Sequence, residues 1–76
     1  MGEGRRTVAT VVRIGPRTTL VALSGWYRGQ ILASVATRDL TAATGISMHP
    51  GSRFWVTAQL DAVRDTDLAL RDWEPT

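Results

Sequence analysis

The chain of 76 residues contains no cysteine and no lysine, and it has a single histidine, His49. Without cysteine, it can form neither a disulfide nor a thiolate metal site. One histidine cannot hold a metal ion alone, and the sequence places no nucleophile or orienting group beside it. We therefore expect no metal site, no cofactor and no enzymatic activity.

Long hydrophobic runs are also missing. No apolar stretch approaches the roughly 20 residues that a membrane-spanning helix needs, and residues 1–6 lack the apolar core of a signal peptide. We therefore expect a cytoplasmic protein that does not contact a membrane. The length suits one small domain, which we place at residues 7–73, after a flexible basic leader at 1–6 and before a tail at 74–76.

The charges are unevenly distributed. All nine basic residues are arginine, whose planar guanidinium suits phosphate binding and ring stacking. GC-rich coding is the simpler alternative explanation, because it favours arginine, alanine, valine, glycine and threonine. Residues 1–60 hold seven arginines against Glu3 and Asp39, whereas residues 61–76 hold five acidic residues against two arginines. A basic body with an acidic end could direct an anionic ligand to one side.

Runs rich in β-branched and apolar residues, separated by turn residues, predict a β-rich chain. Gly15-Pro16-Arg17 and Pro50-Gly51 are typical of turns. Residues 38–45 predict one short helix, with Asp39 or Thr37 capping its start and Gly45 ending it. The predicted strands are Thr7–Ile14, Thr18–Leu23, Gln30–Thr37, Arg53–Val63 and Leu68–Trp73.

Five strands with the only helix between the third and the fourth resemble the OB-fold, a small Greek-key barrel. An SH3-like barrel is the main competitor, but its helical element usually follows the fourth strand. The expected fold class is therefore all-β with one short helix, arranged as a five-stranded OB-like barrel.

Over most of residues 8–73, the succession of motifs resembles RNA-binding OB domains of the ribosomal-protein and initiation-factor-one type. The motifs include Gly29-Gln30-Ile31-Leu32-Ala33-Ser34-Val35, Pro50-Gly51-Ser52-Arg53-Phe54-Trp55-Val56 and the ending Asp67-Leu68-Ala69-Leu70-Arg71-Asp72-Trp73. The resemblance implies RNA binding through aromatic and basic residues of the second and third strands. Here Ser34 and Ala36 occupy outward positions of the third strand, and the aromatic residues lie elsewhere.

A second resemblance covers Ile31 to Ala58. The stretch from Thr44 to Trp55, with its Pro50-Gly51 turn, is similar to the oxyanion-binding OB domains of molybdate transporters. This resemblance implies an oligomer that binds a small oxyanion at subunit interfaces.

The turn Ser24–Gln30 is the most distinctive candidate site, because two glycines enclose Trp26, Tyr27 and Arg28. Aromatic residues at an exposed hairpin tip could stack on nucleobases while the arginine contacts phosphate or stacks on a ring. The alternative, weighed equally, is that Trp26 folds back and closes one end of a small core.

A second candidate face lies on the fourth predicted strand. Alternation places Trp55 outward if Phe54 is inward, next to Arg53, Thr57 and Gln59. Trp55 could stack on a base, or it could cover the leader or a partner. For Trp73, which alternation puts on the same face as Arg71, we expect packing at the barrel rim.

Other polar residues suggest weaker sites. Asp65 and Asp67 could hold a magnesium ion, although a solvated turn explains them more simply. The remaining candidate phosphate contacts are Arg5, Arg6, Arg13, Arg17 and Arg38.

Three functions follow from these residues. The first is a non-catalytic module that binds single-stranded nucleic acid, RNA more readily than DNA. The second is a protein-interaction module, or an accessory subunit of a larger assembly, that uses the same aromatic residues. The third, a minor one, is an oligomer that binds a small oxyanion.

Overall fold

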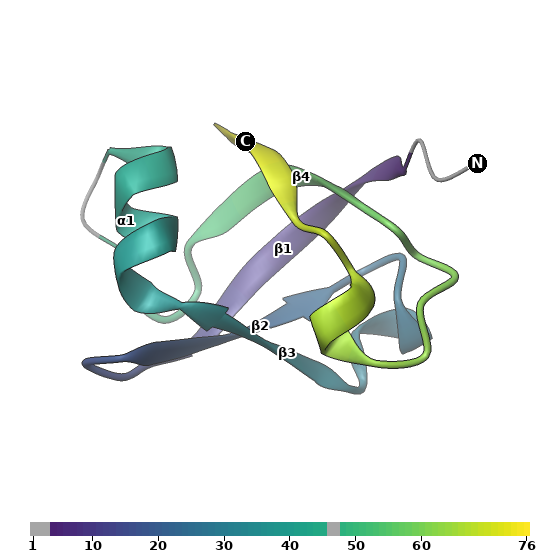
Figure 1. The fold of residues 1–76 in the computed structure, drawn as a ribbon. Coiled ribbons are helices and arrows are strands. Elements are labelled where there is room, and N and C mark those ends of the chain that lie inside the picture. Colours follow the sequence, from purple (N-terminus) through teal and green to yellow (C-terminus); the bar gives the residue numbers. More distant parts are fainter. Residues whose placement is uncertain (1–3, 46–47) are drawn as a thin grey trace.

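The computed structural model describes residues 4–45 and 48–76, and within them the chain forms five strands, one α-helix and two short 3-10 turns (Figure 1). None of the helices in this part of the chain is long and apolar enough to cross a membrane. The elements are β1 (Arg5–Ile14), β2 (Thr18–Leu23), η1 (Tyr27–Gly29), β3 (Leu32–Ala36), α1 (Thr37–Thr44), β4 (Arg53–Ala58), η2 (Asp65–Asp67) and β5 (Arg71–Pro75).

The strands form one antiparallel sheet in the order β3-β2-β1-β4-β5. The prediction of a mainly β chain with its helix between the third and fourth strands is confirmed. The sheet is not closed, because β3 and β5 are its two edges. In Figure 1, α1 and η2 lie on the side where these edges face each other; α1 contacts both β3 and β5, and η2 contacts β3.

One face of the sheet forms the hydrophobic core. Alternate residues of β1, β2 and β4 point to this inner face, because side chains alternate along a strand. Ala9 pairs with Leu23 on one side and with Phe54 on the other, and all three are buried. Leu40 of α1 and Leu68 before β5 cover the core.

A bulge in β1 changes which residues share a face. Simple alternation puts Val12 with Ile14, and Arg13 with Val11. In the structure the β1–β2 register shifts between Val11 and Arg13, so Arg13 pairs with Leu20 on the outer face. Val12 becomes the extra residue and is exposed. Simple alternation would put Arg13 on the inner face with Val11, and the bulge turns it to the outer face.

A second bulge separates Arg71 from Trp73. Thr57 pairs with Arg71 and Trp55 pairs with Glu74, so β5 carries one extra residue between these pairs. Asp72 lies there with φ of 57°. Trp73 turns inward and packs edge-on against Phe54 at 6.3 Å between ring centroids, which agrees with the expected rim packing.

Several predicted boundaries were wrong. β1 begins at Arg5, inside the expected leader, and β5 runs to Pro75, inside the expected tail. The predicted strand Arg53–Val63 ends at Ala58, and residues 59–63 instead form a loop that leads to η2. Ile46 and Ser47, part of the predicted lead into the Pro50-Gly51 turn, lie outside the described residues.

The ends of α1 follow the expectation only at the C-terminus. Gly45 ends the helix in the left-handed conformation, with φ of 68°. At the other end the N-cap is Ala36, and no side chain caps the helix. Thr37 Oγ1 instead donates to the Gly15 carbonyl at 2.8 Å and lies 2.8 Å from Thr19 Oγ1. This hydroxyl ties the helix to the β1–β2 turn.

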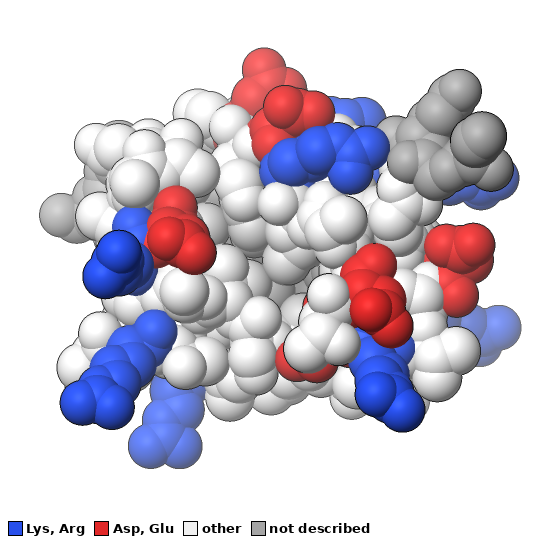
Figure 2. All heavy atoms as spheres, viewed as in Figure 1, with Lys and Arg blue, Asp and Glu red and all other residues white. Residues whose placement is uncertain are grey.

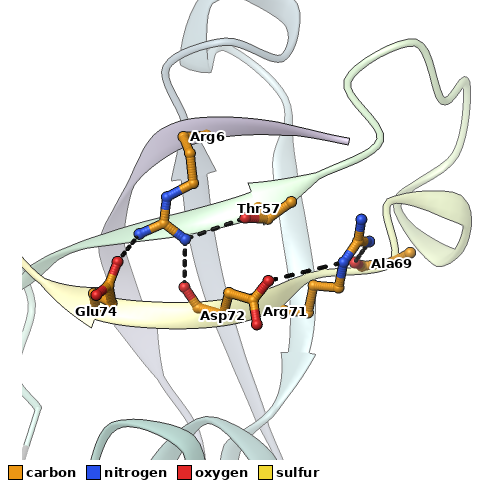
Figure 3. A network of polar contacts seen from close by, with 6 residues as sticks. All are labelled: Arg6, Thr57, Ala69, Arg71, Asp72 and Glu74. Atoms are coloured by element: carbon orange, nitrogen blue, oxygen red, sulfur yellow. Dashed lines mark hydrogen bonds and ion pairs between the residues drawn. The ribbon is translucent and has the colours of Figure 1, made fainter. Parts of the chain in front are cut away.

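Arg6 at the start of β1 reaches across β4 to β5 (Figure 3). Its guanidinium donates to Thr57 Oγ1 at 3.1 Å and to the Asp72 carbonyl at 2.6 Å, and it forms an ion pair with Glu74. One arginine therefore joins three strands and holds the bulged part of β5.

Replacing Arg6 by alanine should lower the free energy of unfolding by about 1–2 kcal/mol, because it removes an ion pair and two hydrogen bonds from a charged donor. Arg6→Lys should recover only part of this, since an ammonium lacks the planar fork. Urea denaturation measures both. Equal stability of wild type and Arg6→Ala would contradict this role.

Candidate binding face and the β2–β3 turn

The outer face of the sheet carries several of the candidate residues. The register places Leu32, Ala22, Thr10 and Arg53 side by side across β3, β2, β1 and β4. Directly paired residues of antiparallel strands have Cβ atoms about 4.5–5.5 Å apart. These four residues, called the outer row below, therefore form a continuous strip across the sheet.

Trp55 lies beside this strip. It pairs with Val8 on β1 and with Glu74 on β5, and its side chain is outward as predicted, with 43% of the residue exposed. Arg53 is two residues away on the same face and is exposed. The fourth strand thus presents an aromatic ring and a guanidinium together, which suits stacking on a planar group and contact with an anion.

Sequence reasoning missed the aliphatic part of this face. Leu20 and Ala22 are half-buried on this face. Leu32, which belongs to the same outer row as Arg53, is 39% exposed. The signal was present in the unbroken apolar run Leu20–Leu23, because a strand with apolar residues on both sides presents one apolar surface away from its core.

The charged residues of β1, β2 and β3 are all arginines. Residues 4–38, which include β1, β2 and β3, contain six arginines and no acidic residue. On the outer face of β1, Arg13 pairs with Leu20, which pairs with Ser34. The acidic residues lie elsewhere; Figure 2 shows them mainly over the segment after β4 and over β5. An anion at the outer row would therefore meet no carboxylate on β1, β2 or β3.

Trp26 folds back and packs into the core, as the second of its two expected positions has it. Only 2% of it is exposed, and its indole Nε1 donates to the Ala62 carbonyl at 2.8 Å. The turn curls back because Gly25 allows close approach: a Cβ there would lie 2.7 Å from Leu60 Cδ1 and 3.0 Å from Thr7 Oγ1. A buried indole cannot stack on a base, so Trp26 is removed from the candidate contacts.

Tyr27 and Arg28 remain outside. Tyr27 is 46% exposed and packs edge-on against Trp26, with 4.8 Å between ring centroids. Arg28 is exposed in the middle of η1. The turn therefore separates its three prominent residues into one core residue and two surface residues.

Arg17 and Arg38 lie at another end of the molecule. The Thr37 amide donates to the Arg17 carbonyl at 2.9 Å, which brings the β1–β2 turn to the start of α1, next to Arg38. Both arginines are exposed. Arg6 is engaged in the contacts of Figure 3, and Arg5 is exposed at the start of β1. The predicted arginines thus do not converge on one point.

Asp65 has a structural partner. Its Oδ2 accepts a hydrogen bond from the Ser34 amide at 3.0 Å, so the carboxylate occupies part of the free edge of β3. Among residues 4–45 and 48–76, no three histidine or acidic residues gather in a way that could hold a metal ion. His49 is exposed in a turn, and its carbonyl accepts a hydrogen bond from the Ser52 amide at 2.9 Å.

Comparisons of this chain with protein-family models, with curated proteins and with solved structures found no match. Its function must therefore be argued from its own residues.

The role of Trp26 can be tested by Trp26→Phe, which keeps a ring but leaves the Ala62 carbonyl without its donor. We expect a loss of about 1–3 kcal/mol in the free energy of unfolding, measured in urea. Trp26→Ala should cost about 3–5 kcal/mol. The matched control is Trp55→Phe, at an exposed site, where the change should stay within about 0.5 kcal/mol. Equal effects at the two positions would contradict the burial of Trp26.

Asp65→Ala should expose the Ser34 amide to solvent. Hydrogen exchange followed by NMR should then show faster exchange at Ser34, while amides of the β1–β2 ladder keep their protection. Asp67→Ala is the control, and it should leave Ser34 unchanged. If Ser34 exchanges at the same rate in Asp65→Ala and in wild type, the carboxylate does not protect this edge.

Proposed function

We propose that the protein is a non-catalytic module that binds single-stranded nucleic acid, RNA in preference to DNA, across the outer face of its sheet. The observation that carries the proposal is that exposed Trp55 and Arg53 lie on the same face of β4, beside β1, β2 and β3, which contain no acidic residue. On the other side of β4, Glu74 of β5 pairs with Trp55, and it forms an ion pair with Arg6. Stacking on an aromatic ring contributes about 1–3 kcal/mol per base and tolerates any sequence. Arginines around the ring would contact the phosphates.

The proposal includes a fold, the OB-type barrel. The strand order β3-β2-β1-β4-β5, with a helix between β3 and β4, supports it. In such a barrel β3 and β5 would meet; here α1 contacts both strands, and the Asp65 carboxylate accepts a hydrogen bond at the edge of β3. Barrels of this class bind oligonucleotides on the outer face of the second and third strands. Cytoplasmic localisation is part of the same proposal.

A protein-interaction module is the second candidate, because the outer face is partly aliphatic. Leu20, Ala22 and Leu32 offer no hydrogen bonds to bases, but they are suitable for an apolar protein contact. Trp55 with Arg53 would then act as the hot spot, since tryptophan and arginine are enriched at such positions.

The test of the first function is fluorescence anisotropy with labelled oligouridylate and oligothymidylate of about ten nucleotides, within the roughly 4–16 nucleotides that such folds cover. Binding to oligouridylate should be the tighter. Three phosphate contacts should make the affinity fall about 20-fold between roughly 50 and 200 mM salt. Trp55→Ala should weaken binding by about 5- to 100-fold.

Arg64→Ala is the matched charge control for Arg53→Ala. Both remove one exposed arginine, but Arg64 belongs to the acidic segment after β4. Arg53→Ala should weaken binding and lower the salt dependence, whereas Arg64→Ala should leave both unchanged. No binding by wild type at low salt would exclude the nucleic-acid function. A partner that is retained after nuclease treatment and lost with Leu32→Ser would then favour the protein-interaction function.

A further inference from the structure

The β2–β3 turn holds two large residues in a costly backbone conformation. Tyr27 has φ of 50°, and Arg28 has φ of 55° with ψ of 29°. The left-handed region costs a residue with a side chain about 1–2 kcal/mol. Glycine adopts it freely, as Gly29 does here with φ of 75°. The turn would therefore be less strained with glycine at position 28.

The other non-glycine residues with positive φ in the described part of the chain make contacts within the fold, whereas the Arg28 side chain makes no hydrogen bond or ion pair there. Asp72 receives a hydrogen bond on its carbonyl from Arg6, and Ala69 receives one from Arg71. Tyr27 packs against Trp26. The Arg28 guanidinium makes no hydrogen bond and no ion pair with any described residue. The strained turn thus displays a cation that the fold itself does not use.

The position of the turn links Arg28 to the outer row. A Cβ built on Gly29, the next residue, would lie 3.9 Å from the Ala22 Cβ, so the turn borders the outer row on β2. From β4 to β3 the row spans three strand spacings, about 14 Å in all. Arg53 is the residue at the β4 end of the outer row, and the backbone of Arg28 lies near the other end of the row, by β2 and β3.

We propose that Arg28 is a second phosphate contact, reached by a single strand that crosses the sheet from Trp55 and Arg53 toward the β2–β3 turn. The inference rests on the proposed function and specifies the path and the minimum length of its ligand. Charge supports the path, because β1, β2 and β3 contribute no carboxylate to it. It also gives the strain a reason, since a strained residue is retained where its side chain has a task outside the fold.

The experiment compares wild type, Arg28→Gly and Arg28→Lys by anisotropy with labelled oligouridylates of about three and about ten nucleotides, the longer within the site sizes of such folds. Arg28→Gly should weaken binding of the longer probe about tenfold and reduce its salt slope by about 0.7. Its affinity for the shorter probe should equal that of wild type. Arg28→Lys should restore most of the loss, because it keeps the charge.

Thermal unfolding separates a binding role from a structural one. The melting temperature of Arg28→Gly should equal or exceed that of wild type, because the relief of left-handed strain, about 1–2 kcal/mol, exceeds the roughly 0.4–1 kcal/mol that the greater freedom of glycine in the unfolded chain costs. The substitution also removes no side-chain hydrogen bond or ion pair to a described residue. A lower melting temperature together with weaker binding would assign Arg28 a structural role and overturn the inference.

The remaining outcomes distinguish the inference from the proposed function. If Arg28→Gly binds both probes like wild type while Trp55→Ala binds weakly, Arg28 is not a contact, and the proposed function stands. If wild type binds neither probe at low salt, the proposed function fails and the inference fails with it.

Discussion

The burial of Trp26 is the contact on which much of the structure depends. The sheet is open between β3 and β5, so no strand pairing holds the loop after β4 against the first half of the chain. The Trp26 indole fills this end of the core and donates to the Ala62 carbonyl in that loop. Asp65 adds a second tie from the same loop to the edge of β3. On this side of the molecule, side chains thus make the connection that a fifth strand pairing, between β3 and β5, would make in a closed sheet.

This packing also determines what remains for binding. With Trp26 inside, the turn offers only Tyr27 and Arg28 to a ligand. The aromatic residue best placed for a ligand becomes Trp55, beside the Arg53 end of the outer row. The two candidate surfaces proposed from the sequence are therefore two ends of one sheet face, joined by Ala22 and Thr10.

The arginines divide into those that the fold uses and those that it leaves exposed. Arg6 and Arg71 both bond to the chain around β5. Arg53 and Arg13 instead stand on the outer face, and Arg28 borders it. GC-rich coding would explain why arginine is abundant, but not why residues 4–38 contain no acidic residue to balance it. The asymmetry favours an anionic ligand over a neutral protein surface.

The succession of five strands with one helix between the third and the fourth, and the outward position of Trp55, could be predicted from the sequence, because period-two alternation and turn residues carry that information. The errors arise where alternation is interrupted. The bulge at Val12 turns Arg13 outward, and the one at Asp72 separates Trp73 from Arg71. Whether Trp26 packs inward depends on Leu60, which lies against Gly25, and on the Ala62 carbonyl. Both are distant from Trp26 in the sequence, so the local pattern could not decide it.

The most direct test is a titration of the labelled protein with oligouridylate at low salt, followed by NMR of the three tryptophan indoles and the backbone amides. The account predicts that the Trp55 indole and the amides of Thr10, Ala22 and Leu32 shift, while the buried Trp26 indole stays in place. Shifts confined to residues 59–76, or no shifts at all, would contradict it.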